Sequence, residues 1–489
     1  MSIVTRGLLI GGREIPSTDN RLVDDISPWT GEVYAKVAAA SPADVTAAVD
    51  AAAAAFPAWA AMRPFQRRKI FLRAADLMEA RIENAIATMA GEVGGARPWA
   101  KFNVELCVEI LREAAAAITQ PVGQMLATDT PGARSYAKRV PYGVIAAISP
   151  WNAPYILGIR SIAIPLAVGN TVVMKPSEDA PISCGLYLAD VLNEAGLPAG
   201  VLNVVTDDLK DAGTVVSTLI ADPRVRLVNF TGSTNVGRII GVEAAKNLKP
   251  AVLELGGKNA LVVLKDADVD YAVKSAIFGA YINSGQICMS TDRVIVVRAI
   301  ADQFVEKFTK AVDAIPYGDP SDPRTLVGPV VNIRAAKRVS ALVKDAISKG
   351  AKVLAGSGEI EGPAGTLLKP MLLADITKDM DIFYGEIFGP ATVVHVVDTI
   401  DEAVALANDS EYGLTGGVIS ENLMEALDVA ERIQTGIIHV NDQGIADEPM
   451  APFGGVKNTG YGRFGGQAGM DAFSATRWIT VQERGHAKY

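Results

Sequence analysis

The sequence contains few of the residues on which metal sites and disulfide frameworks depend. Its 489 residues include three histidines, and none has the spacing of a metal-ligand pair, so a zinc hydrolase and a histidine-based catalytic triad are disfavoured. The three cysteines lie far apart, at Cys107, Cys184 and Cys288. This spacing excludes a disulfide framework and a Cys-x-x-Cys metal site. We therefore expect no metal ion, and a nucleophile here needs a base other than histidine.

Long apolar runs and blocks of like charge are also missing. No segment has the roughly 18 uninterrupted apolar residues of a membrane span, and residues 1–16 lack the charged head and apolar core of a signal peptide. With 46 Lys and Arg against 55 Asp and Glu, the formal charge is -9, and no basic surface for nucleic acid is indicated. We expect a cytoplasmic protein that binds neither a membrane nor a nucleic acid.

Composition and patterning predict a globular α/β protein of more than one domain. Hydrophobic residues make up 49% of the chain, as in ordinary globular proteins. A length of 489 residues, against about 100 to 200 for a common domain, favours two or three domains. Short β-rich runs alternate with helical patterns from about residue 140, and a second such series follows Glu254. This alternation predicts βαβ units, and two parallel-sheet domains in series are the simplest arrangement.

Two helices and one hairpin are predicted outside these series. Ser41 can cap a helix over residues 42–62, and a second amphipathic helix is expected over about residues 64–91. A Thr-Pro-Gly turn signal predicts an extended hairpin within residues 127–141. Because hairpins rarely stand alone in water, we expect this one to pack on another element or another subunit, together with the extended segment 475–481.

A glycine-containing turn at residues 230–237 is a candidate phosphate site. It follows an apolar strand pattern and precedes a helix expected from about Val236, with Gly232 and Ser233 in the turn. The free N–H groups and the positive dipole end at such a helix start suit a phosphate. The motif differs from the usual G-x-G-x-x-G pattern, and alone it is better explained as a plain strand-to-helix turn.

A second indication of a nucleotide is the pair Lys175 and Glu178, after a predicted strand over residues 171–174. Nucleotides bind at the carboxyl edge of parallel sheets. A carboxylate there accepts both hydroxyls of an adenosine ribose and repels a 2′-phosphate. The pair therefore favours NAD over NADP, although an exposed ion pair explains the two residues equally well.

Three residues carry groups that suit carbonyl chemistry. Asn152 precedes a predicted helix and either caps it or offers a neutral N–H to a developing oxyanion. Glu254 precedes two glycines, and partial burial would raise its pKa toward the range of a general base. In isolation, a salt bridge with Lys258 is the simpler explanation of Glu254. Cys288 follows small polar residues, and at a loop-to-helix transition the helix N–H groups would favour its thiolate.

Four segments together resemble signature segments of the aldehyde dehydrogenase superfamily, and the resemblance covers nearly the whole chain. Two are similar to its active-site signatures: Leu-Glu-Leu-Gly-Gly-Lys at residues 253–258 and Gly-Gln-Ile-Cys at residues 285–288. The others are Gly-Glu-Ile-Phe-Gly-Pro at residues 385–390 and a glycine-rich stretch at residues 452–466. The resemblance implies an α/β fold with two Rossmann-like parallel-sheet domains, one for the cofactor and one catalytic, and a small β oligomerisation domain.

The same resemblance implies domain limits and an assembly. The NAD-binding domain takes residues 1–122 and 141–253, and the catalytic domain takes residues 254–454. The oligomerisation or bridging segments are residues 123–140 and 455–489. A homodimer or a homotetramer is implied.

Residue roles are implied only at positions that match the family's motifs. Cys288 would be the nucleophile, Asn152 with the Cys288 backbone N–H the oxyanion hole, and Glu254 the general base. The residues expected to hold NAD, or less favourably NADP, are Trp151, Lys175, Glu178, Gly232, Ser233, Val236, Glu386 and Phe388.

The implied reaction is oxidation of an aldehyde to a carboxylic acid. Attack by the Cys288 thiolate on the aldehyde carbon creates an oxyanion that Asn152 stabilises, and hydride transfer to the nicotinamide leaves a thioester. Glu254 is suited to deprotonate the water that cleaves this thioester. The reaction requires neither a metal ion nor a histidine.

The substrate is expected to be an aromatic aldehyde in an apolar pocket. Residues 440–449 resemble the branch of the family that oxidises vanillin, benzaldehyde and salicylaldehyde. Ile287 and Met289 flank Cys288 and would make its surroundings apolar. Trp99 offers a flat apolar wall, although core packing also explains it.

Arg160 lies eight residues after Asn152 on the same predicted helix face, so it is expected to look toward the substrate. It would bind a phenol oxygen or lie against an aromatic ring, and a buried pair with an acidic residue explains it equally well. The rival enzyme is a semialdehyde dehydrogenase in which Arg160 grips a carboxylate. A non-catalytic dinucleotide-binding protein of the same fold is the alternative from another class.

Overall fold

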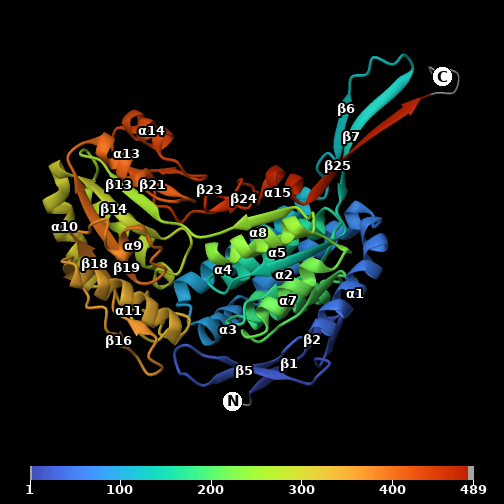
Figure 1. The fold of residues 1–489 in the computed structure, drawn as a ribbon, viewed down its shortest axis with the longest axis horizontal. Helices are drawn as coiled ribbons and strands as arrows, with labels where there is room; N and C mark the ends of the chain where they lie inside the picture. The colour runs from blue at the N-terminus through green and yellow to red at the C-terminus, as the bar shows by residue number, and fades with distance from the viewer. Residues whose placement is uncertain (1–2, 483–489) are drawn as a thin grey trace.

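Two large β-sheets organise residues 3–482, the part of the chain that the computed structural model describes. Figure 1 shows them in two halves of the molecule, with the N-terminal half on the right and the yellow and orange elements on the left. Each sheet has a centre of parallel strands, with helices packed on its faces. This arrangement confirms the expected α/β fold with two parallel-sheet domains.

The first sheet has eight strands in the order β24-β12-β11-β8-β9-β10-β2-β3. The five neighbouring strands β12, β11, β8, β9 and β10 run parallel to one another, whereas β24, β2 and β3 are antiparallel to their neighbours. The central strands β8 and β9 are buried at every position, as expected for strands covered on both faces. The strands are β2 (Leu8–Ile10), β3 (Arg13–Ile15), β8 (Val144–Ser149), β9 (Thr171–Pro176), β10 (Leu202–Val204), β11 (Val225–Thr231), β12 (Ala251–Glu254) and β24 (Gly460–Tyr461).

The helices of this half begin with α1 (Pro42–Ala60), which is capped as predicted. The Ser41 hydroxyl accepts a hydrogen bond from the Asp44 N–H, and the Asp44 carboxylate accepts one from the Ser41 N–H. The prediction of one helix over residues 64–91 is wrong, because the backbone leaves helical geometry at Arg81, where ψ is 15°. The others are α2 (Pro64–Ala80), α3 (Ile82–Val93), α4 (Arg97–Ala117), α5 (Pro154–Ala167), the π-helical turn η1 (Ile182–Leu186), α6 (Tyr187–Glu194), α7 (Ala212–Ala221) and α8 (Thr234–Lys246).

The second sheet has seven strands in the order β15-β18-β19-β14-β13-β21-β22, and all but β15 run parallel. The strands are β13 (Asn259–Val263), β14 (Thr291–Val297), β15 (Lys352–Ala355), β18 (Met371–Ala374), β19 (Ala391–Val397), β21 (Gly416–Ile419) and β22 (His439–Val440). Its helices and helical turns are α9 (Val269–Tyr281), η2 (Ile282–Gly285), α10 (Arg298–Asp313), α11 (Ile333–Ser348), α12 (Asp381–Tyr384), α13 (Ile400–Asn408) and α14 (Leu423–Arg432).

Small sheets lie at the edges of the two halves. A three-stranded sheet that the sequence analysis did not anticipate lies near the N-terminus, and Figure 1 shows it along the lower side of the molecule. It consists of β1 (Val4–Arg6), β5 (Val33–Ala38) and β4 (Leu22–Ile26). Two-stranded pairs are formed by β16 (Ile360–Glu361) with β17 (Leu367–Leu368) and by β20 (Tyr412–Gly413) with β23 (Val456–Lys457).

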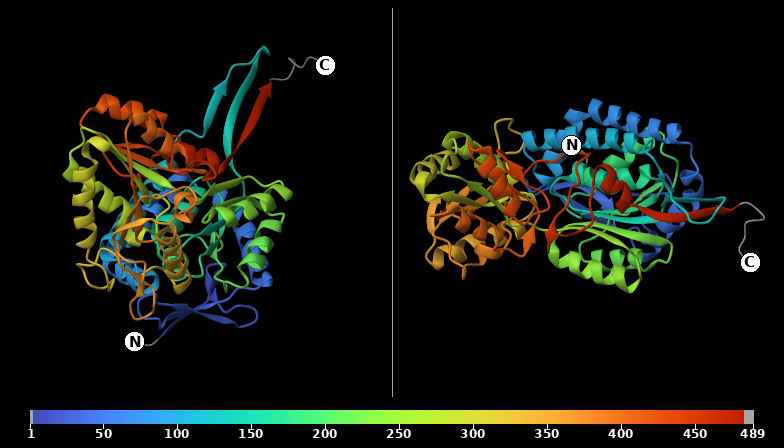
Figure 2. Two further views of the ribbon diagram at one scale, coloured as in Figure 1. Left: turned by 60° about the vertical axis from the view of Figure 1, so that its left-hand side comes forward. Right: turned by 90° about the horizontal axis from the view of Figure 1, so that it is seen from above.

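A hairpin forms around the predicted Thr-Pro-Gly turn, but its first strand lies at residues 123–126, before the predicted range of 127–141. It projects from the body of the molecule in all three views (Figures 1 and 2). Strand β6 (Gly123–Leu126) pairs with β7 (Ala133–Pro141), and β7 pairs along its whole length with β25 (Ser474–Gln482). The C-terminal segment therefore joins the hairpin, as expected. The short helix α15 (Gly466–Ala472) precedes β25. The expected domain limits stay predictions, and residues 1–2 and 483–489 of those ranges lie outside the described residues.

Within residues 3–482, no single helix is both long and apolar enough to cross a membrane. The consecutive helices α1 and α2 pass that test of length and composition only as a pair, and they are bent by 120° where they meet.

Candidate active site

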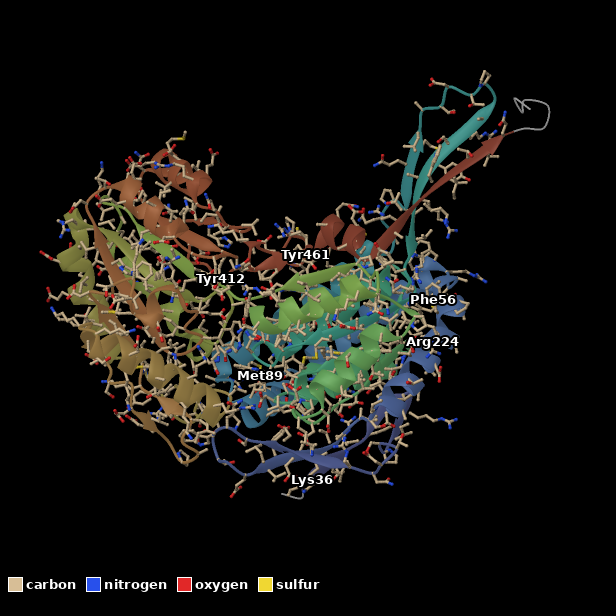
Figure 3. All side chains as sticks on the ribbon, viewed as in Figure 1. Lys36, Phe56, Met89, Arg224, Tyr412 and Tyr461 are labelled. Carbon is tan, nitrogen blue, oxygen red and sulfur yellow. The ribbon has the colours of Figure 1, made fainter. Side chains whose placement is uncertain are left out.

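A cavity of about 430 Å³ is lined by residues from both halves of the molecule, and its size is that of a ligand pocket. Asn152, Glu254 and Cys288 all line it, although they are far apart in the sequence. Tyr412, labelled in Figure 3, lines it as well. The complete lining is Pro150, Trp151, Asn152, Leu157, Thr231, Gly232, Ser233, Thr234, Asn235, Glu254, Leu255, Gly256, Cys288, Arg338, Glu386, Phe388 and Tyr412.

Asn152 does not cap the helix that follows it. The N-cap of α5 is Ala153, and the Asn152 side chain instead donates a hydrogen bond from Nδ2 to the Gln286 carbonyl oxygen, at 2.9 Å. The backbone carbonyl of Asn152 accepts two hydrogen bonds, from Trp99 Nε1 at 3.0 Å and from Asn283 Nδ2 at 2.8 Å. Asn152 is thus held through its side chain and its backbone carbonyl beside the segment that carries Cys288.

The segment before Cys288 turns through three consecutive residues in the left-handed region. The φ angles of Asn283, Ser284 and Gly285 are 51°, 57° and 67°. A Cβ on Gly285 would lie 2.0 Å from the carbonyl oxygen of Gly389, so only glycine fits there. Non-glycine residues adopt this conformation at an energetic cost, and such strain is concentrated at functional sites.

Cys288 does not lie at the start of a helix, and the expectation of a thiolate favoured by helix N–H groups is wrong. The segment after Cys288 leads into strand β14. Burial raises the pKa of the Cys288 thiol well above its usual value, and the carboxylate of Glu254 acts in the same direction. The resting side chain is therefore a neutral thiol, which needs a base in order to react.

Glu254 lies beside Cys288 on the lining of the same cavity. It ends strand β12, whose last residues pair in register with β11, and its side chain is buried. Burial raises its pKa to about 8, although the charge of Arg160 acts against the rise. Within the described residues, Oε1 has no hydrogen-bond partner. The salt bridge with Lys258 does not form, because Lys258 Nζ lies 3.2 Å from Asp292 Oδ2 instead.

Glu386 and Phe388 lie on a loop that is tied to the glycines after Glu254. The N–H of Gly257 donates to Glu386 Oε1 at 2.9 Å, and a Cβ on Gly256 would lie 2.9 Å from the same carboxylate. Phe388 has a φ of 45° and meets the ring of Trp151 edge-on, with 5.6 Å between ring centroids. Burial raises the pKa of Glu386 to about 7. The two sheets therefore meet at this loop.

The glycine turn lies at the start of helix α8, as predicted. Its N-cap, Ser233, makes no side-chain cap, so the first N–H groups of α8 are not satisfied by that side chain. Gly232 and Ser233 line the cavity together with Thr234 and Asn235. Val236 is half exposed and is not part of the lining. The arrangement suits a phosphate group against the helix terminus.

Lys175 and Glu178 lie outside the lining of the cavity, at the carboxyl end of β9. They are paired with each other, as the alternative interpretation predicted, but the pair is largely buried: the lysine side chain is 5% exposed and the glutamate 18%. Lys175 Nζ also lies 3.1 Å from Oδ1 of Asp207, whose side chain is fully buried. The cation therefore lies between two carboxylates.

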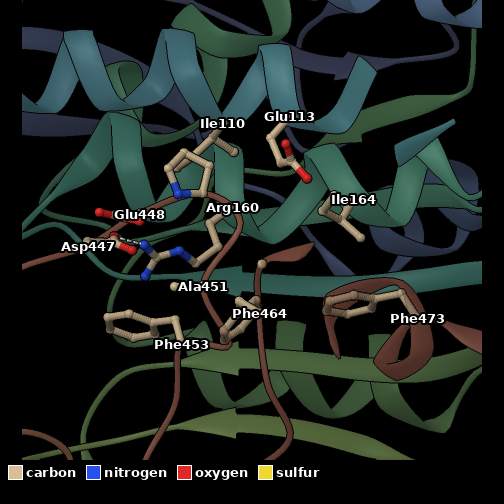
Figure 4. Close-up of a pocket in the computed structure, with 12 residues that line it drawn as sticks. Ile110, Glu113, Arg160, Ile164, Asp447, Glu448, Ala451, Phe453, Phe464 and Phe473 are labelled. Atoms are coloured by element: carbon tan, nitrogen blue, oxygen red, sulfur yellow. Dashed lines mark hydrogen bonds and ion pairs between the residues drawn. The ribbon is translucent and has the colours of Figure 1, made fainter. Parts of the chain in front are cut away.

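The residues expected to bind the substrate are all buried. Trp99, Ile287 and Met289 belong to the hydrophobic core of the first half, and Trp99 contributes its indole N–H to Asn152. Arg160 forms a buried ion pair with Asp447, which was the alternative considered for it. Its guanidinium also lies over the ring of Phe453, at 4.2 Å from the centroid, and Figure 4 shows it between that ring and the carboxylate.

Several residues of the site escaped the sequence analysis. Tyr412 and Arg338 line the cavity, and Arg338 donates to the carbonyl oxygens of Glu386 and Phe388, at 3.1 and 3.2 Å. Asp207 pairs with the buried cation Lys175, and Asp447 with the buried cation Arg160. Asp447 lies within the segment 440–449 that resembles the aromatic branch, but the sequence analysis gave it no role, and no motif marks the other three residues. For Asp207 the available signal is the acidic pair Asp207 and Asp208, which follows Thr206 after the β-rich run of residues 201–205.

Comparison with models of known protein families shows the family of the chain. The model of the aldehyde dehydrogenase family matches residues 15–479. The chain therefore belongs to the aldehyde dehydrogenase family, whose members are oxidoreductases that use nicotinamide dinucleotides, and the resemblance inferred from the motifs is confirmed.

Several similar proteins are dehydrogenases of aromatic aldehydes. A vanillin dehydrogenase of Pseudomonas sp. (strain HR199 / DSM 7063) is 50% identical over 475 residues, which is 97% of each chain. The crystal structure of a salicylaldehyde dehydrogenase from Pseudomonas putida G7, complexed with salicylaldehyde, superposes with a TM-score of 0.95 at 41% identity over 99% of each chain. The crystal structure of PnpE in complex with nicotinamide adenine dinucleotide has a TM-score of 0.93 at 34% identity over 97% of each chain.

Proposed function

We propose that the protein oxidises an aromatic aldehyde to the carboxylic acid with NAD, through a covalent intermediate on Cys288. The observation that carries this proposal is the shared cavity, in which Cys288, Asn152 and Glu254 meet a helix terminus and a loop suited to a dinucleotide. Overall, the aldehyde, NAD and water become the acid, NADH and a proton.

The first step is attack by sulfur on the carbonyl carbon. Because the resting Cys288 is a neutral thiol, its proton passes to Glu254, whose carboxylate lies beside it and whose Oε1 is free to accept. The carbonyl oxygen becomes an oxyanion, which the Asn152 side-chain amide and the Cys288 backbone N–H stabilise. Trp99 and Asn283 hold Asn152 in place through its carbonyl.

The residues around the cavity fit a dinucleotide. The uncapped start of α8 suits the pyrophosphate, and Glu386 with Phe388 suits the nicotinamide riboside. Gly256 keeps the backbone clear where a Cβ would press on the Glu386 carboxylate. The chemistry that a bound NAD supplies is the acceptance of a hydride from the carbon attached to Cys288.

The second half of the reaction releases the acid from a thioester on Cys288. Glu254 takes a proton from the attacking water, and a pKa of about 8 leaves it basic enough for this task near neutral pH. For this step Glu254 must first release to solvent the proton that it took from Cys288, which is the proton set free in the overall reaction. As the carbon–sulfur bond breaks, the Cys288 sulfur leaves and takes from Glu254 the proton that came from water. A catalytic thiol must remain reduced, which fits the cytoplasmic location that we propose.

The preference for an aromatic aldehyde is supported by Arg160. Its charge is already neutralised by Asp447 and its flat face is covered by Phe453, so it offers no free cation to a carboxylate. A semialdehyde carrying a carboxylate would therefore gain little from Arg160. The vanillin and salicylaldehyde relatives support the same preference.

The experiment that tests this function measures NADH formation by absorbance with vanillin, benzaldehyde, salicylaldehyde and succinate semialdehyde. We expect the aromatic aldehydes to have kcat/KM values at least about 100-fold above that of succinate semialdehyde, because a carboxylate in an apolar site leaves a charge unpaired. The variant Cys288→Ala should bind NAD and form no NADH. Equal turnover of the semialdehyde would contradict the aromatic preference. NAD binding without oxidation of any aldehyde would support the non-catalytic alternative.

We also propose a homodimer or a homotetramer. The sheet of β6, β7 and β25 projects from the body and carries exposed apolar side chains, among them Met125 and Trp478, which are 75% and 71% exposed. Large exposed apolar side chains on an unpartnered sheet mark contact surfaces.

A further inference from the structure

Asp207 is a buried carboxylate that the reaction described above does not use. Strands β9 and β10 are parallel neighbours, with Met174 beside Val204. Their carboxyl ends therefore lie together, and this register brings Lys175, one residue after Met174, close to Asp207. Glu178 joins them from the turn after β9. Three charged side chains thus meet at the edge of the sheet where nucleotides bind.

The three side chains are layered by depth. Asp207 is innermost with a side chain that is 0% exposed, Lys175 follows at 5%, and Glu178 is outermost at 18%. Within the described residues, neither carboxylate oxygen of Asp207 accepts a hydrogen bond of good geometry, and Lys175 Nζ at 3.1 Å is its ion-pair partner. Asp207 therefore supports no turn or helix end, and its effect on its surroundings is electrostatic.

Asp207 and Glu178 together keep Lys175 charged. Burial acts to lower the pKa of Lys175, but the carboxylates of Asp207 and then of Glu178 outweigh it, so the pKa is raised. Burial raises the pKa of Asp207 to about 7, so this carboxyl is largely ionised in the mildly alkaline range. With all three groups ionised, the cluster carries one net negative charge.

Two further cations of the neighbouring loops are paired with carboxylates. Arg21 lies 2.6 Å from Asp211, and Lys210 lies 2.9 Å from Asp208. A phosphate approaching the edge therefore meets the carboxylate of Glu178 first. Lys175 lies behind Glu178, and its charge is already neutralised by Asp207. An anion needs a cation that is free to pair with it.

We propose that Asp207 is a second determinant of cofactor choice, which neutralises Lys175 from inside the protein and so excludes the 2′-phosphate of NADP. With a dinucleotide bound, Glu178 would meet the ribose and repel the phosphate directly, whereas Asp207 would act through Lys175 without touching the cofactor. Asp207 is accordingly a positioning and specificity residue, and its role rests on the proposed use of NAD.

The test measures binding rather than turnover. The enzyme without cofactor is titrated with NAD and with NADP, and quenching of tryptophan fluorescence gives the two dissociation constants at pH 8. In Asp207→Asn, we expect the dissociation constant for NADP to fall by about tenfold, which is the effect of about 1.4 kcal/mol. The constant for NAD should change by less than about threefold.

Two further variants show whether the effect passes through Lys175. In the Lys175→Met background, the additional change Asp207→Asn should no longer improve NADP binding, because the lysine that Asp207 neutralises is absent. The matched control is Asp208→Asn, which removes one negative charge from the same loop without touching Lys175. This control should leave the ratio of the two constants within about twofold of the wild type.

The proposal is wrong if Asp207→Asn leaves the ratio of the two constants unchanged, or if Asp208→Asn changes it equally. A thermal melt identifies a variant that does not fold, and Asp207→Ser then takes its place. If neither variant folds, Asp207 is a structural ion-pair partner and the proposal also fails. If the wild type binds neither dinucleotide, the proposed function itself is wrong, which is a separate outcome.

Discussion

At the scale of single residues, the site keeps protons on groups that would lose them in water. Burial raises the pKa of Glu254 to about 8 and that of Glu386 to about 7, and it raises the pKa of the Cys288 thiol well above its usual value. The common cause is the low polarity of the cavity floor, which disfavours charge. The reaction then depends on the fraction of Glu254 that is ionised.

Activity should therefore rise with pH. Glu254 acts as a base only when it is deprotonated, so kcat/KM should increase about tenfold per unit well below pH 8 and level off above it. The measurement is a pH profile of NADH formation between pH 6 and 9.5. In Glu254→Gln the rise of kcat/KM with pH should disappear, together with most of the activity. A profile that is flat from pH 6 to 9 would contradict the role of Glu254.

Removal of the oxyanion donor should affect turnover and leave folding intact. We expect Asn152→Ala to lower kcat by about 100- to 1,000-fold, since one such donor typically contributes that much. Its side chain caps no helix and makes one buried hydrogen bond, to the Gln286 carbonyl, so we expect a loss of about 1 to 3 kcal/mol of unfolding free energy and a protein that still folds. Steady-state kinetics and a thermal melt together check this expectation. A loss of stability equal to the loss of activity would make Asn152 a structural residue.

The three residues that we propose as catalytic could be picked out because they lie within short motifs, and the structure brings them to one cavity, whereas their partners could not be picked out. Cys288, Glu254 and Asn152 are each recognised from a few neighbours in the sequence. Asp447 meets Arg160 across 287 positions of the chain, and no local pattern records such a pair. The wrong expectation for Cys288 has the same origin, because the sequence around it does not show that strand β14 rather than a helix follows.

At the scale of elements, two backbone turns press against each other beneath the cavity. One contains Gly285 and carries Cys288, and the other contains Gly389 after Phe388. The sequence predicted the helices and central strands well, because apolar periodicity specifies them. It did not predict the break at Arg81, since the apolar spacing continues across it, nor the left-handed run that begins at Asn283, which depends on contacts from other segments.

The turn before Cys288 should not tolerate a side chain at Gly285. In Gly285→Ala the new Cβ would lie 2.0 Å from the Gly389 carbonyl, in a backbone conformation that alanine adopts at a cost of about 1 to 2 kcal/mol. We expect a loss of at least about 2 kcal/mol of unfolding free energy and a large loss of activity. Denaturant titration measures the unfolding free energy, and NADH formation measures the activity. The control is Gly213→Ala on α7, where a Cβ meets no atom within 4 Å.

The pair between α5 and the loop at Asp447 should behave as a buried ion pair. Asp447→Ala leaves the Arg160 charge unpaired in an apolar site, so we expect a loss of about 3 to 5 kcal/mol of unfolding free energy. The double variant Arg160→Met, Asp447→Leu removes both charges and should recover most of the lost unfolding free energy. The exposed pair of Arg298 and Asp398 is the control, and Asp398→Ala should cost less than about 1 kcal/mol. Equal losses for the two single variants would contradict the importance of burial.

At the scale of the whole molecule, the two sheets and the projecting β6–β7–β25 sheet have different tasks. The halves enclose the cavity, whereas the projecting sheet makes few contacts with either. Composition and alternation were enough to predict the two halves. The sheet near the N-terminus was not predicted, since its strands are short and β4 is mostly exposed, so no alternation is visible.

The projecting sheet should hold the proposed assembly together. Trp478→Glu places a charge on its exposed apolar surface, so we expect the oligomer to dissociate toward the monomer. Light scattering after gel filtration gives the mass. The control is Phe65→Glu on α2, a residue of similar exposure far along the chain, which should leave the mass unchanged. An unchanged mass for Trp478→Glu would show that this sheet is not the interface.

The high pKa of Cys288 has a consequence for the survival of the enzyme. Peroxides and alkylating agents attack thiolates, and a sulfur that stays protonated reacts with them slowly. In the proposed mechanism the Cys288 thiol thus stays unreactive until a deprotonated Glu254 takes its proton. Resistance to oxidative damage at rest and dependence on a neighbouring base during turnover then have one cause, the raised pKa of this thiol.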